Sequence, residues 1–144
     1  MRILVAILFV GQLAFLGCTL SPRSTRALTG RVEMRQAIFR GCQDLENQKD
    51  VVSFLVSEGF RCQFIENGAF DDNIGPVENG YDPLTYGGTV LNDHESRVFR
   101  NKNYVYGQRT DQSTFPTDRV WHIAVVLNDD GSPTDAFVYT QHIK

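Results

Sequence analysis

The sequence has no concentration of positive charge. Its 144 residues carry a formal net charge of −3, the pI is about 5.5, and the arginines are scattered along the chain. Proteins that bind nucleic acid present clustered lysine and arginine to the phosphate backbone. We therefore expect no nucleic acid among the partners of this protein.

The short motifs of common catalytic sites are also missing. The chain has no G-x-S-x-G nucleophile turn, no phosphate-binding P-loop, no G-x-G-x-x-G dinucleotide turn and no H-E-x-x-H zinc pair. It contains no internal repeat and no low-complexity run. We accordingly expect no metal and no cofactor, and the sequence does not identify a specific activity.

Long apolar runs are absent except at the N-terminus. Residues 3–16 are apolar apart from Gly11 and Gln12, and Arg2 precedes them. About fourteen residues of helix span roughly 21 Å, which is short of the ~30 Å hydrocarbon core of a bilayer. This length and the preceding positive charge are typical of a secretory signal peptide, which we predict over residues 1–17.

The apolar run ends at Phe15-Leu16-Gly17-Cys18. The pair Gly17-Cys18 resembles the lipobox of bacterial lipoprotein precursors, in which a small residue precedes the cysteine that is acylated and becomes the mature N-terminus. Phe15 and Leu16 differ from the leucine and small residue that are usual at those positions. The resemblance implies a lipid on Cys18. Because Thr19 is not the aspartate of inner-membrane retention, it also implies an outer-membrane lipoprotein that faces the periplasm. The alternative is a secreted or periplasmic soluble protein.

The rest of the chain has the length of one domain. Residues 19–26 are rich in Ser, Thr, Pro and Arg, which predicts a flexible tether. We place the lipidated cysteine and tether at residues 18–28 and a single α+β domain at residues 29–144. A domain of this length buries one core without a metal or several disulfides.

The stretch 120–143 predicts a β-hairpin. Two runs rich in β-branched and aromatic residues flank the turn formers of residues 128–133, where Gly131 supplies a positive φ. By the two-residue period of a strand, one face of the first run carries Trp121, Ile123, Val125 and Leu127. Its other face is also largely apolar, so we place this strand centrally in a sheet. We predict that the ring of Trp121 lies against a helix in the core.

Helices are expected before the strands. Residues 27–41 contain good helix formers, which favours a helix, although residues 32–38 also alternate as in a strand. Asn47 suits the N-cap of a second helix that ends at Glu58. Alternating apolar residues predict strands at residues 60–65 and 96–108. The fold class is therefore α+β, with one or two N-terminal helices packed on a three- to five-stranded antiparallel sheet ending in a β-hairpin. This order is similar in architecture to small outer-membrane-assembly lipoproteins and β-lactamase-inhibitor-like modules, and the likeness implies no activity.

Cys42 and Cys62 bracket the second helix and the chain reversal after it. In an exported protein we predict a disulfide between them, because oxidising compartments favour such bonds. Closing a loop of this size stabilises the fold by about 3 kcal/mol in the chain-entropy model. Two buried free thiols that pack as small apolar side chains are the alternative.

Residues 67–92 are rich in glycine and proline and predict a long surface loop, a type of segment that often carries function. We predict that the loop and nearby aromatics form a contact surface, for which the candidate residues are Tyr81, Tyr86, Tyr104 and Tyr106. The function that follows is a membrane-anchored cell-envelope lipoprotein that acts as a non-enzymatic binding or interaction module. Its partners are the membrane, through the N-terminal lipid, and another envelope protein.

Histidines offer the alternative chemistry. His94 lies between two acidic residues, and His122 and His142 lie near the two ends of the hairpin. The first group has the composition of an acid–base or cation site, and the second pair is able to share a metal only if it meets across the strands. A solvated loop end and a half-buried structural histidine explain the same residues. The alternative function is a small exported hydrolase that uses His94 or His122.

Overall fold

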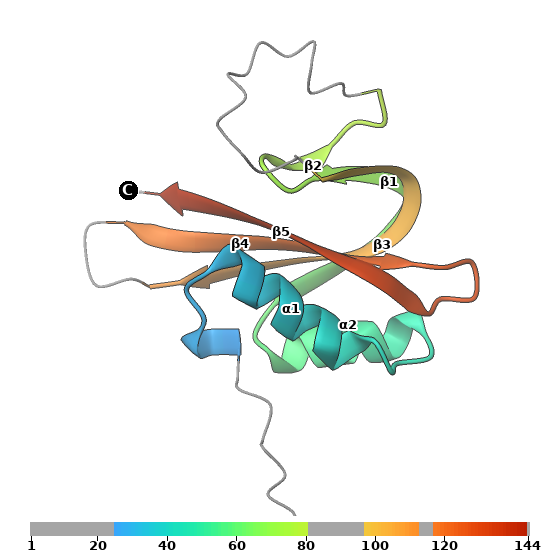
Figure 1. Ribbon diagram of the computed structural model, residues 1–144, viewed down its shortest axis with the longest axis horizontal. Coiled ribbons are helices and arrows are strands. Elements are labelled where there is room, and N and C mark those ends of the chain that lie inside the picture. The colour runs from blue at the N-terminus through green and yellow to red at the C-terminus, as the bar shows by residue number, and fades with distance from the viewer. Residues whose placement is uncertain (1–24, 81–96, 113–116, 144) are drawn as a thin grey trace, which may run out of the picture.

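A computed structural model describes residues 25–80, 97–112 and 117–143. Within these residues two α-helices precede a five-stranded antiparallel sheet, which confirms the predicted α+β class (Figure 1). The elements are η1 (Thr25–Ala27), α1 (Arg31–Cys42), α2 (Gln48–Ser57), β1 (Arg61–Asp71), β2 (Gly75–Val77), β3 (Val98–Asp111), β4 (Asp118–Leu127) and β5 (Pro133–Ile143). The strand order across the sheet is β2-β1-β3-β4-β5.

Helix α2 begins as its sequence predicts. The side-chain oxygen of Asn47 accepts a hydrogen bond from the backbone N–H of Asp50 at 3.0 Å, and the Asp50 carboxylate complements the helix dipole in the first turn. The helix ends at Ser57, and Gly59 then takes a left-handed φ of +89° that reverses the chain into β1. Helix α1 begins at Arg31, later than the predicted start at residue 27.

Local irregularities accompany the curl of the sheet. The register between β1 and β3 shifts between Ile65 and Gly68 and again before Phe70. Near these shifts Asn67 and Asn101 have positive φ values of 48° and 52°, a conformation that asparagine adopts more readily than most residues. Bulges of this kind bend and twist a strand pair. Figure 1 shows β1 and β3 turning sharply together at one side of the sheet.

The strands are longer than predicted. Strand β1 continues to Asp71 and pairs with β2, so the first part of the expected loop at residues 67–92 is sheet. Strand β3 runs to Asp111 rather than ending at residue 108. The bulge in β1 interrupts the two-residue alternation of side chains. For this reason the sequence pattern did not predict the second half of the strand.

The helices cover one face of the sheet. The first apolar cluster joins the helices to β4, and its members include Met34, Ile38, Val51, Leu55, Trp121, Ile123, Val125 and Leu127. The predicted face of the hairpin strand is therefore confirmed, as is the position of the Trp121 ring in the helix-covered core. The indole N–H of Trp121 donates to the Asp111 carboxylate at 2.8 Å, so the one polar atom of this ring has a partner.

A second apolar cluster lies on the opposite face, inside the curl. It consists of Phe70, Phe99, Tyr104, Ala124, Val126 and Phe137. The ring centroid of Phe99 lies 4.9 Å from that of Phe137 and 5.0 Å from that of Tyr104, and both pairs meet edge to face. Strand β4 is thus buried on both faces, as we predicted for a central strand.

The N-terminal turn η1 belongs to the body of the domain. Thr25 is only 3% exposed, and its hydroxyl and carbonyl oxygens accept hydrogen bonds from the Arg109 guanidinium at 2.8 and 3.2 Å. The same guanidinium pairs with both carboxylate oxygens of Asp111. The packed chain therefore starts before the predicted domain start at residue 29.

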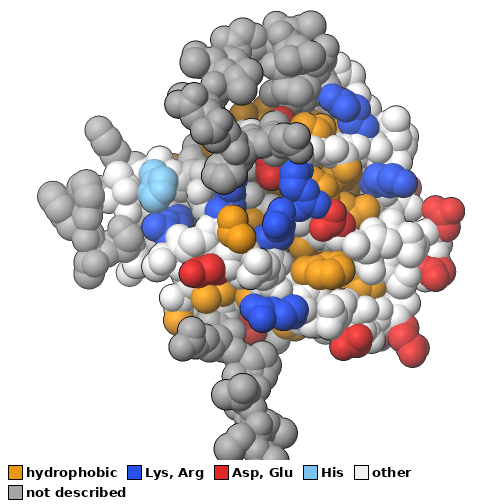
Figure 2. All heavy atoms as spheres, viewed as in Figure 1, with side chains coloured by type: hydrophobic (Ala, Val, Ile, Leu, Met, Phe, Trp, Pro, Cys, Tyr) orange, Lys and Arg blue, Asp and Glu red, His pale blue; other side chains and the backbone are white. Residues whose placement is uncertain are grey.

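The side of the molecule that Figure 2 shows carries charges of both signs. Basic side chains spread across the middle of the view, and acidic side chains gather along the right-hand rim. Among the residues that the structure describes, no helix combines the length and apolarity needed to cross a membrane.

Candidate functional site

Beside the second apolar cluster, on the face opposite the helices, the sheet exposes polar and aromatic side chains. The register aligns one row across four strands, formed by Arg61, Gln108, His122 and Tyr139. Two residues along the strands from this row, on the same face, Gln63 pairs with Tyr106. Two residues in the other direction, Gln141 pairs with Val120. We call these residues, apart from the buried Val120, the open face. Its arginine and glutamines are exposed, and its three rings are half-buried.

Three rings lie in contact at the centre of the open face. The Tyr106 hydroxyl and Nδ1 of His122 share a hydrogen bond of 2.6 Å, and the two ring planes differ by 28°. On the other side of His122, the ring centroid of Tyr139 lies 5.4 Å away. The hydrogen bond and the flanking rings therefore hold the imidazole in one orientation.

The centre of the open face is uncharged at neutral pH. Burial lowers the pKa of His122 below its usual 6.5, and the side chain of Gln141 nearby offsets this shift only in part. The Nε2 atom of His122 is buried and makes no hydrogen bond of normal geometry. Burial also raises the pKa of the Tyr106 hydroxyl, which stays protonated. The centre thus presents the neutral phenol of Tyr106 and the neutral imidazole of His122, with glutamine amides around them.

This arrangement does not resemble the active site of a histidine-dependent hydrolase. The Nδ1 partner of His122 is a phenol, whereas a catalytic histidine base is usually oriented by a carboxylate. His142 pairs in register with Arg119 and lies on the other face of the sheet from His122, so these histidines do not meet. Within the described parts of the chain, no three His, Cys, Asp or Glu side chains gather to hold a metal ion. His94 lies outside the described residues.

Of the four predicted contact tyrosines, Tyr106 belongs to the open face. Tyr104 is 3% exposed in the second apolar cluster, and burial raises its pKa, so its predicted role as a contact residue is wrong. The two tyrosines share a face of β3, but the curl of the sheet covers Tyr104 and leaves Tyr106 at its margin. Tyr81 and Tyr86 lie outside the described residues.

Sequence reasoning missed Tyr139 and the three glutamines. A signal was present, because the two-residue period of β5 sets Tyr139 and Gln141 on the face opposite Val138. The same period in β1 sets Gln63 on the face opposite Cys62 and Phe64, and in β3 it sets Gln108 on the face opposite Val105. The pairing register, which brings all four onto one surface, was not readable from any single strand.

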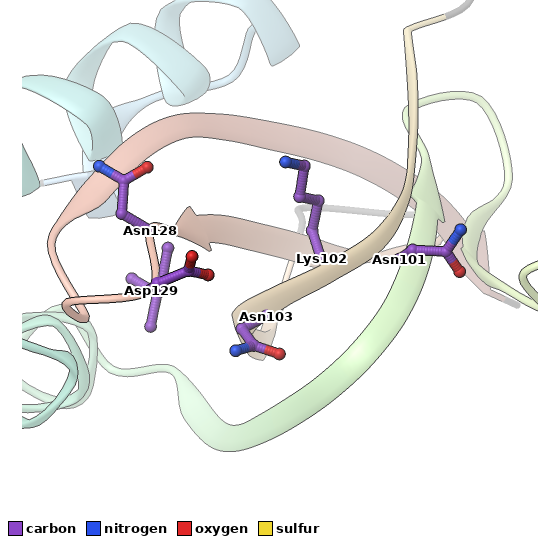
Figure 3. Close-up of a pocket in the computed structure, with 6 residues that line it drawn as sticks. Asn101, Lys102, Asn103, Asn128 and Asp129 are labelled. Atoms are coloured by element: carbon purple, nitrogen blue, oxygen red, sulfur yellow. The ribbon is translucent and has the colours of Figure 1, made fainter.

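A polar hollow of about 230 Å³ lies at another end of the sheet, beside the hairpin turn. Its lining consists of Asn101, Lys102, Asn103, Leu127, Asn128 and Asp129. Figure 3 shows the β3 residues on one side and the turn residues on the other. The Asn103 side chain accepts from the backbone N–H of Asn67 at 3.0 Å. We therefore assign Asn101 and Asn103 to the bulge that curls the sheet. Asn128 belongs to the hairpin turn, where its side chain donates to the Ser132 hydroxyl at 3.2 Å.

Cys42 and Cys62 are free thiols in the structure, which differs from the predicted disulfide. Cys42 is fully buried in the first apolar cluster, and Cys62 packs against that cluster with its thiol directed at the backbone carbonyl of Phe60. Burial, aided by the neighbouring Cys62, raises the pKa of Cys42 to about 12, and burial raises that of Cys62 to about 11. Thiols in this state are inert core groups and not activated nucleophiles.

We expect both thiols of the native protein to resist alkylation at pH 8. With pKa values this high, about 10⁻³ or less of either thiol is ionised at that pH, and only the thiolate reacts. Labelling should accelerate as the pH approaches 11, with Cys62 ahead of Cys42, and both should react quickly in denaturant. Iodoacetamide labelling followed by peptide mapping measures each cysteine separately. Rapid native labelling at pH 8, or a mapped Cys42–Cys62 disulfide, would contradict this.

Comparison of the chain with known protein families, with characterised proteins and with solved structures finds no match.

Proposed function

We propose that this protein is a membrane-anchored cell-envelope lipoprotein that acts as a non-enzymatic binding module through its open face. The single observation that carries the binding role is the distribution of side chains over the sheet. The helices cover one face, and the described strands carry all of their tyrosines and glutamines on the other. An exposed surface of this composition is suited to recognition by hydrogen bonds.

The open face is preformed. Its side chains project from paired strands, and the contact of His122 with Tyr106 and Tyr139 restricts the central rings. Groups that are already ordered lose less conformational entropy on binding. Catalysis by a nucleophile has less support, because burial or partial burial raises the pKa of both described cysteines and the Nδ1 partner of His122 is a phenol.

The proposed anchor holds the domain close to the membrane. Residues 19–24 separate Cys18 from Thr25. Even a fully extended chain spans at most about 25 Å over this distance. Since Arg109 fixes Thr25 to the domain, a lipid on Cys18 places the domain beside the bilayer and favours a ligand within the envelope.

We expect the mature protein to carry lipid mass on Cys18 as its first residue and to partition into the detergent phase. The Cys18→Ser variant lacks the acylated thiol, so it should remain unprocessed or change its membrane fractionation. Phase partitioning and mass spectrometry of the N-terminal peptide measure these outcomes. Cys62→Ala is the matched control, because it removes a cysteine elsewhere and should leave the lipid in place. A mature protein that begins downstream of Cys18 and has no lipid would refute the lipoprotein assignment.

A further inference from the structure

We infer that the open face binds a neutral glycan chain that bears hydroxyl and acetamido groups. This inference rests on the proposed binding function and names its ligand class. It is carried by three properties of the open face, which are its hydrogen-bonding chemistry, its charge and its extent.

The hydrogen-bonding chemistry suits a ligand that both donates and accepts. Each of Gln63, Gln108 and Gln141 offers an amide N–H₂ and a carbonyl oxygen, and all three side chains are exposed. The phenol of Tyr139 adds a group of the same dual kind, whereas the Tyr106 hydroxyl already shares a hydrogen bond with His122. Sugar hydroxyls donate and accept in the same way, and an acetamido group pairs with an amide side chain through both of its polar atoms. An apolar ligand would instead bury these amides without partners, at a free-energy penalty for each.

The charge of the open face argues against an ionic ligand. Arg61 is its one cation and lies at the β1 end of the row. The residues at its centre are His122, which is neutral at pH 7, and two phenols. An anionic polymer requires several cations along its path, and a cationic one requires carboxylates. The centre of the open face supplies neither, so it is matched to an uncharged chain.

The extent of the open face fits a polymer. Its central row crosses four strands, and adjacent strands lie about 4.8 Å apart, so the row is roughly 14 Å long. The neighbouring rows lie one pleat to either side. This area exceeds a single sugar ring, which is similar in size to one phenol ring. A chain laid along the row would contact Tyr139, His122 and Gln108 in turn.

A protein partner is less well matched. Protein interfaces have a desolvated core of aromatic and aliphatic side chains with a polar rim. The open face lacks an exposed aliphatic centre, because its aliphatic neighbours Val120 and Ala124 are buried. Its exposed side chains are an arginine and three glutamines, whereas Tyr106 and Tyr139 are half-buried.

The experiment is calorimetric titration of the full mature protein in detergent with tetra-N-acetylchitotetraose as the probe. We expect saturable binding that weakens about tenfold in Gln108→Ala and in Gln141→Ala, as is typical for loss of one or two hydrogen bonds. Both residues are exposed, so the variants should fold. Gln36→Ala is the matched control, because Gln36 is exposed on α1 away from the open face. It should bind like the parent protein.

Further titrations and a crosslinking experiment distinguish failure of the glycan inference from failure of the proposed binding function. Cellotetraose, which lacks the acetamido groups, should bind more weakly, and a glucosamine tetramer, which is cationic, should bind weakly or not at all. Absence of binding to every oligosaccharide by folded protein would overturn the glycan inference. Photo-crosslinking from Gln108 to an envelope protein, with no glycan bound, would also overturn it while leaving the binding function intact. Loss of the lipid on Cys18 would affect only the anchor and not these titrations.

Discussion

Trp121→Ala is expected to lower the thermal midpoint sharply or to abolish folding. Trp121 has no exposed surface, and it packs in the cluster that joins both helices to β4. Replacing a buried aromatic of this size with alanine typically destabilises a protein by about 3–5 kcal/mol. The whole domain is held by only about 5–15 kcal/mol. The variant also loses the hydrogen bond from the indole N–H to Asp111.

Two variants and one spectroscopic signal test this expectation. Trp121→Phe keeps an aromatic ring but loses the N–H donor, so it should be less destabilising than alanine. Val56→Ala is the surface control, because Val56 on α2 is 55% exposed, and it should change stability by less than about 0.5 kcal/mol. The chain has one tryptophan, so native emission should be blue-shifted and should move to the red on denaturation. Native emission typical of a solvated indole, together with normal folding of Trp121→Ala, would show that the assignment of this face is wrong.

Local chemistry made some elements of the fold predictable. The α2 N-cap at Asn47 and the turn at Gly131 depend on side-chain and backbone preferences within a few residues, and the structure shows both. The face of β4 that carries Trp121 follows from a two-residue period without interruption. These features needed no knowledge of which strands pair.

The curl and the open face depended on pairings that are distant in sequence. The bulge near Asn67 interrupts the alternation of β1, so the second half of that strand resembled a loop. The open face joins Gln63, Gln108 and Gln141 only through the registers of three strand pairs. Tyr104 and Tyr106 look alike in sequence, and the curl decides which of them is buried. For that reason the sequence indicated both tyrosines as contact residues and did not distinguish the buried Tyr104 from the half-buried Tyr106.

The burial of Arg109 also depends on contacts with segments that are distant in the sequence. Arg109 lies just beyond the strand predicted at residues 96–108, yet it is only 7% exposed. Its guanidinium has five N–H donors in a planar fork, and the structure shows acceptors from three separate segments around it. These are the Asp111 carboxylate, the Glu58 carbonyl and Thr25. No local pattern indicates that an arginine at this end of β3 will be enclosed by a turn far earlier in the chain.

Arg109→Ala is the second substitution with a large expected effect. It removes hydrogen bonds of 2.8 and 2.9 Å to Asp111, one of 2.9 Å to the Glu58 carbonyl and two to Thr25, together with a guanidinium 4.6 Å from the Phe60 ring centroid. Removing one partner of a buried ion pair typically lowers stability by about 3–5 kcal/mol, because the remaining charge and carbonyls lose their partners. Since Asp111 is partly exposed, we expect about 3 kcal/mol, the lower end of that range.

The measurement must separate loss of the Arg109 hydrogen bonds from a general loss of stability. If Arg109 fastens η1, amide hydrogen exchange at Leu28, which donates to the Thr25 carbonyl, should accelerate more in Arg109→Ala than exchange within β4. Arg109→Lys keeps the charge but lacks the planar fork, so it should recover only part of the stability. Lys102→Ala is the control on the same strand, because its exposed side chain lies far from η1 in register, and it should behave like the parent protein. Uniform acceleration across the domain, with no excess at Leu28, would mean that Arg109 supports the core without fixing the N-terminal turn. The short link from Cys18 would then end at a movable segment, and a lipid there would no longer hold the domain at a fixed point on its surface.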